Sequence, residues 1–372
     1  MSTPFKIIDL FAGPGGLDMA AKALDIPVVM GIEWDEDACT TRRAAGLPTE
    51  TGDVRKYNPS QFPEADVLVG GPPCQTFTVA GNGEGRAALE QVLEFAKRYA
   101  AVQLDRQAEE FAAIREDLGQ LSDERTGLVL EPLRWALEAL AGGKPYQVIV
   151  LEQVPAVLPV WRAFGEILES KGYKVAEPEV LHTEEFGVPQ TRRRAILIAR
   201  WAGDGARFQA DPKLPEPSHR CYRKGIHRHQ GDSSRLPWAT MQEALGRTDC
   251  FEVVSNYGTG GDPRARGRRR HDEPSATVTG KASRNKLVWG EQHLGTFSLP
   301  ELGMLQTFSR DYPWRRRNGD DVEGVDAPGV RSVIAQQIGN AVPPRLGMHV
   351  LAAALGIKRE DLESALKLQF DY

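Results

Sequence analysis

The sequence predicts an α/β fold with a doubly wound, mostly parallel sheet, and three observations support this fold class. Short β-branched runs alternate with helix-like segments over the first 80 residues. Glycine-rich turns follow two of these runs, and two more apolar runs, at 147–152 and 194–199, have the length of buried strands. Strand–helix alternation of this kind predicts parallel strands with helices on both faces.

The first elements follow from the local pattern. Apolar runs bounded by turn residues predict strands at 6–11, 28–33 and 66–69. Alanine content and apolar spacing predict helices at 17–24 and 35–45. The first strand ends in FAGPGG, and the third ends in GGPP. Both turns are therefore expected where a strand passes into the segment beyond it.

Residues 86–118 contain neither Gly nor Pro, and apolar side chains from Leu93 to Leu118 fall close to one helical stripe. This pattern predicts one long helix, a break near 119–123 and a second helix at 128–141. The two helices can form a hairpin. A stripe of this kind most often packs within its own chain, so we expect a monomer.

The character of the chain changes after residue 200. Residues 201–272 are irregular, with scattered Pro, Gly, Arg and His. This composition predicts a smaller, loop-rich second domain. Residues 273–372, where regular patterns resume and an Ala- and Leu-rich terminal helix is expected, return to the domain formed by 1–200.

Composition excludes several classes of protein. The apolar share of 41% and charged share of 26% are those of a globular chain, and no stretch approaches the roughly 18 apolar residues of a membrane span. The N-terminus lacks the features of a signal peptide. The four cysteines are widely spaced, which favours neither a metal site nor a disulfide framework. We therefore expect no metal and a reducing, cytoplasmic location.

Charge is distributed unevenly along the chain. The net charge is −5, yet residues 211–290 carry 15 Lys and Arg against 9 Asp and Glu. Residues 84–125 carry 10 acidic against 6 basic residues. One face built for a polyanion explains this segregation, and two differently solvated surfaces explain it equally well.

A strand followed by FAGPGG and a helix is typical of a nucleotide-binding turn, because glycines allow a ligand to approach and the helix N-terminus offers free N–H groups. The second strand ends in Glu33 and Trp34. The carboxylate can accept hydrogen bonds from ribose hydroxyls, and the indole can lie against a purine. Asp53 can reach an exocyclic amine. Taken separately, Glu33, Trp34 and Asp53 each fit a position without a ligand as well as a ligand contact.

Cys74 follows Gly70-Gly71-Pro72-Pro73, which projects a thiol from a rigid turn at the carboxyl edge of the sheet. Structural cysteines more often lie within apolar runs. The neighbours of this cysteine are turn residues and polar side chains, which favours a reactive thiol.

Two more charged positions lie at strand ends. Glu152 ends an apolar run, where partial desolvation lets a carboxyl group hold a proton near neutral pH. Arg192 and Arg194 alternate on an expected strand and so point the same way. They can pair with Glu152, a base carbonyl or a phosphate, or form a solvated basic turn.

The segment QIGNAVPP, residues 337–344, is expected to open a helix. Asn340 at such a start can cap the helix or bind a ligand.

Taken in chain order, these segments resemble the DNA (cytosine-5) methyltransferase family. The motifs span residues 9 to 344 in the order DLFAGPGG, EW, GDV, GGPPCQTF, LEQV, FGVPQTRRRAILIA, LGMLQTFS and QIGNAVPP. The resemblance implies the fold of S-adenosylmethionine-dependent methyltransferases. It makes 1–200 and 273–372 the catalytic and cofactor-binding domain, with an insertion at 86–125, and 201–272 the target-recognition domain.

The resemblance also implies residue roles. Glu33 holds the ribose of S-adenosylmethionine, Trp34 stacks on its adenine and Asp53 binds the adenine amine. Cys74 attacks carbon 6 of a cytosine flipped out of double-stranded DNA. The base is gripped by Glu152, Arg192 and Arg194. The rest of the cofactor pocket is formed by Phe11, Gly13, Pro14, Gly15, Gly16, Pro73 and Asn340.

Two departures from the family pattern bear on the Cys74 loop. Gln153 stands where the family usually has Asn after the catalytic Glu, and about 40 additional residues, 86–125, follow that loop. Two alternatives to a DNA methyltransferase stay open: the same chemistry on RNA, and a catalytically silent DNA-binding relative. A restriction endonuclease that acts separately is a further possible partner.

Overall fold

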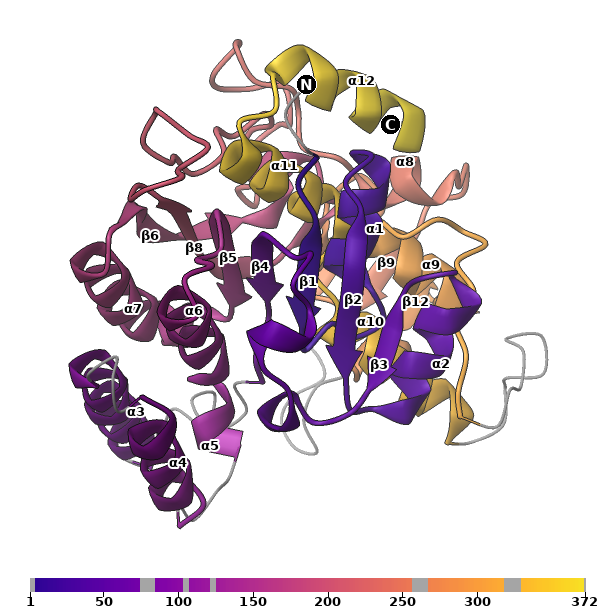
Figure 1. Cartoon of the computed structure of the whole chain (residues 1–372). Coiled ribbons are helices and arrows are strands. Elements are labelled where there is room, and N and C mark those ends of the chain that lie inside the picture. Colours follow the sequence, from indigo (N-terminus) through magenta and orange to yellow (C-terminus); the bar gives the residue numbers. More distant parts are fainter. Residues whose placement is uncertain are drawn as a thin grey trace.

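The computed structural model describes residues 4–73, 84–102, 107–120, 125–255, 267–317 and 329–370. A seven-stranded sheet with the order β3-β2-β1-β4-β5-β8-β6 forms its centre (Figure 1). Strand β8 is antiparallel to its two neighbours, and the other pairings are parallel. The strands are β1 (Ile7–Leu10), β2 (Val28–Glu33), β3 (Thr49–Thr51), β4 (Val67–Gly70), β5 (Val148–Gln153), β6 (Tyr173–His182) and β8 (Arg193–Trp201).

Helices cover both faces of this sheet, which confirms the doubly wound, mostly parallel fold class. Alternate residues of each strand point to opposite faces, so Leu68 packs in one apolar cluster while Val67 and Val69 pack in another. The first cluster includes α6 (Glu131–Ala141) and α7 (Leu158–Ser170). The second includes α1 (Gly16–Ala23) and α11 (Pro344–Leu355), beside which lies α12 (Arg359–Gln369).

The inserted segment differs from its prediction. Instead of one long helix, the chain forms α3 (Glu84–Ala101) and α4 (Gln107–Leu118), which fold back on each other. The rings of Tyr99 and Phe111 meet edge to face with their centroids 4.9 Å apart. In a continuous helix their Cα atoms would be about 18 Å apart along the axis. Folding back lets the two apolar faces bury each other, a gain that sequence periodicity does not reveal.

The α3–α4 pair packs on the main body of the protein. Val92, Ala96 and Ile114 belong to the same apolar cluster as β1, β5 and α7, and Figure 1 shows the pair beside α7 and α6. The predicted partner, 128–141, is instead a short helix α5 (Arg125–Leu128) followed by α6. The insertion therefore packs on the main body of the protein, with α7 among its partners.

A second, four-stranded sheet has the order β10-β9-β12-β13. It joins strands on both sides of residue 272, so the boundary expected there falls inside one structural unit. The reason is that β12 pairs directly with β9, a long-range contact that composition cannot show. The elements of this region are β9 (Glu252–Val254), β10 (Arg268–Arg270), β12 (Lys286–Trp289), β13 (Gln292–Gly295), α8 (Met241–Leu245), α9 (Leu299–Leu305) and α10 (Val330–Asn340).

The remaining elements are short. Two-residue strands β7 (Gln190–Thr191) and β11 (Ser275–Ala276) pair with each other and form a separate two-stranded sheet. Helix α2 (Glu36–Ala44) follows β2. Across the ranges described, no helix combines the length and apolar character needed to cross a bilayer.

Candidate active site

The carboxyl ends of four neighbouring parallel strands bring predicted site residues to one edge of the sheet. Leu10 pairs with Ile32 on one side and Gly70 on the other, and Gly70 pairs with Leu151. This is the edge at which ligands bind in open α/β sheets. Four segments therefore lie side by side at this edge of the sheet: residues 11–16, 33–34, 71–73 and 152.

The FAGPGG loop has a backbone conformation that requires glycine. Gly13 and Gly15 have φ of 53° and 102°, and Phe11 also takes the left-handed region at 59°. Gly15 is the N-cap of α1. A Cβ on Gly16 would lie 2.1 Å from the carbonyl oxygen of Val342. The loop is thus pressed against the segment after α10, and only glycine permits this approach.

Glu33 and Trp34 lie beside this loop. The carboxylate of Glu33 accepts backbone N–H groups from Gly13, Trp34 and Asp35, each at 2.8 Å. Burial raises the pKa of Glu33, and these three hydrogen bonds oppose the shift. A carboxylate has about four acceptor positions, so one remains for a ligand hydroxyl. Trp34 is 56% exposed, which leaves it open to stacking.

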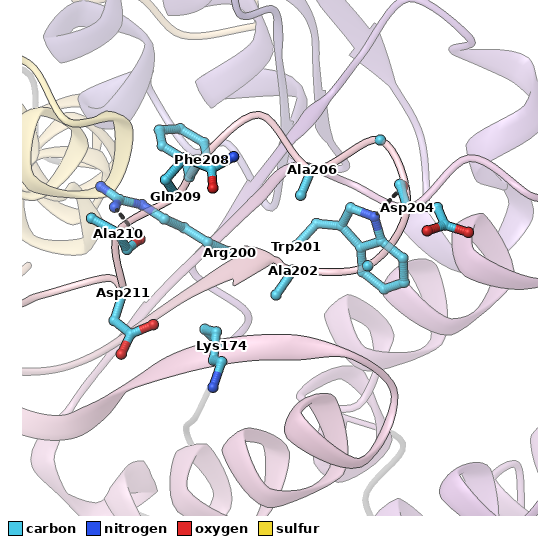
Figure 2. Close-up of a pocket in the computed structure, with 12 residues that line it drawn as sticks. Lys174, Arg200, Trp201, Ala202, Asp204, Ala206, Phe208, Gln209, Ala210 and Asp211 are labelled. Carbon is cyan, nitrogen blue, oxygen red and sulfur yellow. Dashed lines mark hydrogen bonds between the residues drawn. The ribbon is translucent and has the colours of Figure 1, made fainter.

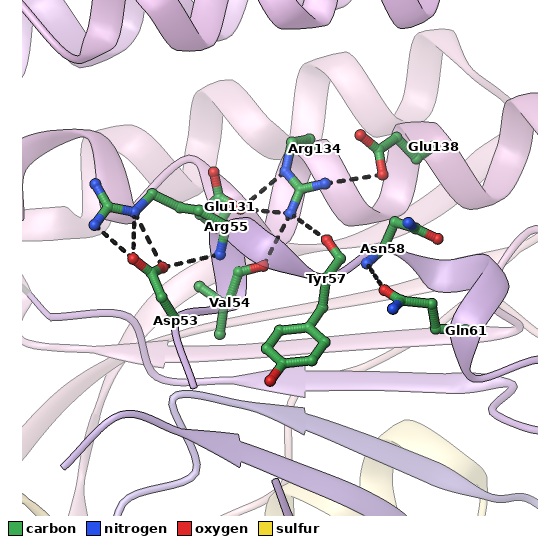
Figure 3. Close-up of polar contacts among 9 residues, drawn as sticks. All are labelled: Asp53, Val54, Arg55, Tyr57, Asn58, Gln61, Glu131, Arg134 and Glu138. Atoms are coloured by element: carbon green, nitrogen blue, oxygen red, sulfur yellow. Dashed lines mark hydrogen bonds and ion pairs between the residues drawn. The ribbon is translucent and has the colours of Figure 1, made fainter. Parts of the chain in front are cut away.

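Asp53 follows β3 and caps the single-turn helix Val54–Lys56. Its carboxylate accepts the backbone N–H of Arg55 and pairs with the Arg55 guanidinium at 2.6 Å (Figure 3). Burial raises the pKa of Asp53, but the Arg55 hydrogen bonds outweigh it and the net shift is downward. Asp53 therefore stays ionised, and Arg55 already occupies part of its acceptor capacity.

Arg134 on α6 fixes the turn that carries Asp53. Its guanidinium donates to the carbonyl oxygens of Val54 and Tyr57 and pairs with Glu131 at 2.7 Å and Glu138 at 2.8 Å (Figure 3). The side chains of Arg134 and Glu131 are 1% and 2% exposed. Removing one member of a buried pair leaves the other charge uncompensated.

We expect Arg134→Met to lower the free energy of unfolding by about 3–5 kcal/mol, as for other broken buried pairs. Urea denaturation followed by circular dichroism measures the change. Arg162→Met removes an exposed pair with Glu177, and is the control, expected to change stability by less than about 1 kcal/mol. Equal effects of the two substitutions would contradict the role given to Arg134.

The side chain of Glu152, on β5, lies beside the turn at which the Cys74 loop begins. Its Oε1 is 2.6 Å from Nε of Arg194, and the side chains are 7% and 12% exposed. A Cβ on Gly71 would lie 3.4 Å from Oε2 of Glu152, which places the carboxylate against the first residue of the turn. The structure thus brings Glu152 and Arg194 together beside that turn. Cys74 itself lies outside the described residues.

Gln153 replaces the usual Asn yet still reaches the Cys74 loop. Its Nε2 donates to the carbonyl oxygen of Pro72 at 2.5 Å, and its Oε1 accepts the N–H of Val154. The longer side chain therefore ties the turn before Cys74 to the end of β5. Although Gln153 departs from the family pattern, it keeps a hydrogen bond between the end of β5 and this turn.

Arg192 lies in the interior, and its role at the base stays a prediction. It is 2% exposed, and its guanidinium donates to the carbonyl oxygens of Val278, Gly339 and Ala341. Residue 192 falls in the break between β7 and β8, so the alternation of a continuous strand does not apply to it. Arg192 thus joins three chain segments through its two terminal nitrogens, and its Nε has no hydrogen-bond partner among the residues described.

Asn340 also differs from its prediction. It ends α10 instead of opening a helix, is exposed, and accepts a hydrogen bond from Nε2 of Gln336 at 2.7 Å. The chain leaves α10 here because Val342 precedes Pro343, and a residue before proline disfavours the helical conformation. Pro343, and not Asn340, is the N-cap of α11.

Two prolines of the predicted pocket are also placed. Pro14 accepts a hydrogen bond at its carbonyl oxygen from the buried hydroxyl of Tyr312. This contact links the FAGPGG loop to the segment that follows α9. Pro73 is partly buried and is the last described residue before Cys74. Both prolines therefore stand at the edge where the sequence places the cofactor.

A basic cavity of about 670 Å³ opens beside Arg194. Its positive charge matches a phosphate-bearing ligand. Part of its wall comes from the irregular segment after β8, which has no periodicity from which a site could have been predicted. The cavity is lined by Pro155, Glu184, Thr191, Arg193, Arg194, Cys221, Tyr222, Lys224, Arg269 and Thr277.

Another hollow, of about 410 Å³, lies at the opposite edge of the sheet (Figure 2). The antiparallel strand β8 ends there, and Arg200 pairs with Val148 at the start of β5. Arg200 already donates to the carbonyl oxygens of Ala210, Ala353 and Ala354. This hollow is separate from the cluster of predicted site residues.

Comparisons with known proteins show which family the chain resembles. A family model described as C-5 cytosine-specific DNA methylase matches residues 5–97. The chain is 26% identical to type II methyltransferase M1.HphI of Haemophilus parahaemolyticus over 94% of this chain and 86% of that protein. It is 25% identical to M.NgoFVII of Neisseria gonorrhoeae over 96% and 88%.

A solved structure shows the same fold. The putative DNA modification methyltransferase encoded within an E. coli prophage superposes with a TM-score of 0.53 at 16% identity, covering 95% of this chain and 99% of that one.

Proposed function

We propose, from the premise that this chain belongs to the C-5 cytosine-specific DNA methylase family, that it transfers a methyl group from S-adenosylmethionine to carbon 5 of cytosine in double-stranded DNA through a covalent bond to Cys74. The observation that carries the proposal is the Glu152–Arg194 pair, held against Gly71 where the Cys74 loop begins. That pair offers a carboxyl group and a cation to one base.

The cofactor edge fits an adenosine-bearing ligand. Trp34 has an exposed ring for a purine, and Glu33 has an acceptor position for a ribose hydroxyl. The N-terminus of α1 suits the carboxylate of an amino acid. When bound there, S-adenosylmethionine supplies an electrophilic methyl group.

The residues of the chain make cytosine able to accept that methyl group. The Cys74 thiolate forms a bond to carbon 6, which gives carbon 5 the character of an enamine. Glu152 holds a proton at ring nitrogen 3, and Arg194 stabilises charge on the ring. After carbon 5 is methylated, its proton goes to a base and the bond from sulfur to carbon 6 breaks. A stacked base is out of reach, so the cytosine must leave the duplex.

The proposed partner is double-stranded DNA, bound by a monomer in the cytoplasm, and a restriction endonuclease acting separately is a further proposed partner. Residues 201–272 and the strands paired with them are proposed to read the target. The local excess of positive charge in 211–290 and the basic cavity beside Arg194 support this division.

A trapping experiment tests the covalent step. A long duplex copied with 5-fluorodeoxycytidine contains every short target, so the recognition sequence need not be known. Fluorine cannot be removed as a proton is, and the adduct persists. We expect a protein–DNA band that survives denaturation, requires S-adenosylmethionine and is absent with Cys74→Ser. If the wild-type protein methylates DNA but forms no such band, the covalent route is contradicted. If it neither methylates DNA nor forms the band, the protein is a catalytically silent relative.

The arginine-rich segment 264–270 is proposed to contact the DNA backbone. Arg264 and Arg266 lie outside the described residues. Arg268 and Arg270 are exposed on one face of β10, paired with Glu252 and Asp272. Arg269 points the other way, over the ring of Tyr222 in the basic cavity.

We expect Arg268→Gln with Arg270→Gln to weaken DNA binding and to reduce the slope of log affinity against log salt by about one unit for each phosphate that the variant no longer neutralises. Fluorescence anisotropy over a salt series measures the slope. Sequence preference should persist. Arg359→Gln, an exposed arginine on α12, is the control. An altered recognition sequence with the original slope would mean that these arginines read bases.

A further inference from the structure

Three side chains of metal-binding type converge at the wall of the basic cavity. His182 is the last residue of β6, and Glu184 lies in the adjoining single-turn helix Thr183–Phe186. Cys221 comes from the irregular segment after β8. One ligand atom from each lies within 4.8 Å of the other two. Their separation in sequence is why the spacing of cysteines alone predicted no metal.

The interactions within this cluster are long. Sγ of Cys221 is 3.5 Å from Nδ1 of His182 and 3.8 Å from Oε1 of Glu184, while Nδ1 and Oε1 are also 3.8 Å apart. A strong hydrogen bond between nitrogen and oxygen spans about 2.7–3.2 Å. The side chain of Glu184 is 5% exposed, and its Oε2 has no hydrogen-bond partner among the residues described. An ionised carboxyl group buried in this way is costly unless it is paired with a cation or takes up a proton.

The triangle matches one face of a tetrahedral zinc site. Zinc bonds of about 2.3 Å to sulfur and 2.0–2.1 Å to nitrogen or oxygen give edges of about 3.4–3.6 Å. The observed edges of 3.5, 3.8 and 3.8 Å reach those values through shifts of a few tenths of an ångström. A set of one sulfur, one imidazole nitrogen and one carboxylate oxygen favours Zn²⁺ over Mg²⁺ or Ca²⁺, which prefer oxygen ligands.

We propose that His182, Glu184 and Cys221 bind one zinc ion, with water as the fourth ligand. Glu184 and Cys221 both line the basic cavity, so the water position faces that cavity. The ion would tie the segment around Cys221 to the end of β6 and thereby fix the wall that also carries Tyr222 and Lys224. This site is independent of the proposed methyl transfer, because none of its ligands is among the groups placed at the base.

The direct test is X-ray absorption spectroscopy of the full-length protein dialysed against zinc and then freed of excess metal. We expect about one zinc per chain with one sulfur at about 2.3 Å and three nitrogen or oxygen neighbours at about 2.0–2.1 Å. A shell without sulfur, or no zinc retained, would overturn the proposal. This measurement uses the wild-type protein and does not depend on whether a variant folds.

Variants assign the ligands. Cys221→Ser and His182→Ala should each lower retained zinc more than about ten-fold and remove the sulfur-to-metal charge-transfer band of the cobalt-loaded protein. Cys250→Ser removes an exposed cysteine and should change neither signal. Zinc and band both unchanged in Cys221→Ser would place the metal on another thiol and refute the site.

Discussion

Cys74→Ser is expected to lower the rate of methyl transfer to DNA by at least about 1,000-fold, or about 4 kcal/mol in transition-state stabilisation. The serine hydroxyl stays protonated at neutral pH and is a poor nucleophile toward carbon 6. Single-turnover transfer of a labelled methyl group measures the effect. The affinity for S-adenosylmethionine should stay near that of the wild type, because the side chain of Cys74 is not among the proposed cofactor contacts.

The control for this substitution is Cys250→Ser, an exposed cysteine that should leave the rate unchanged. Near-normal turnover by Cys74→Ser would refute the nucleophile. A lower rate that arises only from weaker cofactor binding would make Cys74 a residue of the pocket and not of the chemistry.

Glu33→Ala should weaken binding of S-adenosylmethionine by about 100-fold, since a hydrogen bond to a charged group is worth about 1.5–3 kcal/mol. The substitution removes the ribose acceptor. It also frees the N–H groups of Gly13, Trp34 and Asp35, which the carboxylate now holds, so the loop loses part of its order. Isothermal titration calorimetry gives the dissociation constant.

Two further variants serve as references for the effect of Glu33→Ala. Glu33→Gln keeps an acceptor but loses the charge, and should fall between wild type and Glu33→Ala. Glu36→Ala, at an exposed acid three residues further on, should bind the cofactor normally. An unchanged dissociation constant for Glu33→Ala would remove Glu33 from the cofactor site.

Most strands of the central sheet were predictable because they are apolar runs ended by turn residues. Strands β3 and β6 were not predicted, because β3 is the polar run TET and β6 alternates buried with exposed positions. The predicted strand 28–33 coincides with β2, and 66–69 differs by one residue at each end from β4. The inserted helices were not predictable in the same way. The sequence has no Gly or Pro between α3 and α4, and the contacts that hold the two helices together, such as Tyr99 on Phe111 and Arg98 with Asp117, are tertiary.

Some of the site residues were likewise predictable from the sequence, and others were not. Glu33 ends β2, beside β1, and Glu152 is the second-to-last residue of β5, beside β4. Parallel pairing brings both residues to one edge of the sheet. The position of Arg192 was not predictable because the interruption between β7 and β8 depends on pairing with β11, more than 80 residues away. The convergence of His182 with Cys221 likewise depends on tertiary contacts, for which a single sequence holds no local signal.

The most direct test of the proposed function is to identify the methylated nucleoside. The protein is incubated with labelled S-adenosylmethionine and either unmodified phage DNA, which supplies many target sequences, or bulk transfer RNA. Each product is then digested to nucleosides and separated. We expect label in 5-methyldeoxycytidine from DNA and none from RNA. Label confined to RNA, or carried on an exocyclic nitrogen of a DNA base, would contradict cytosine-5 methylation of DNA by this protein.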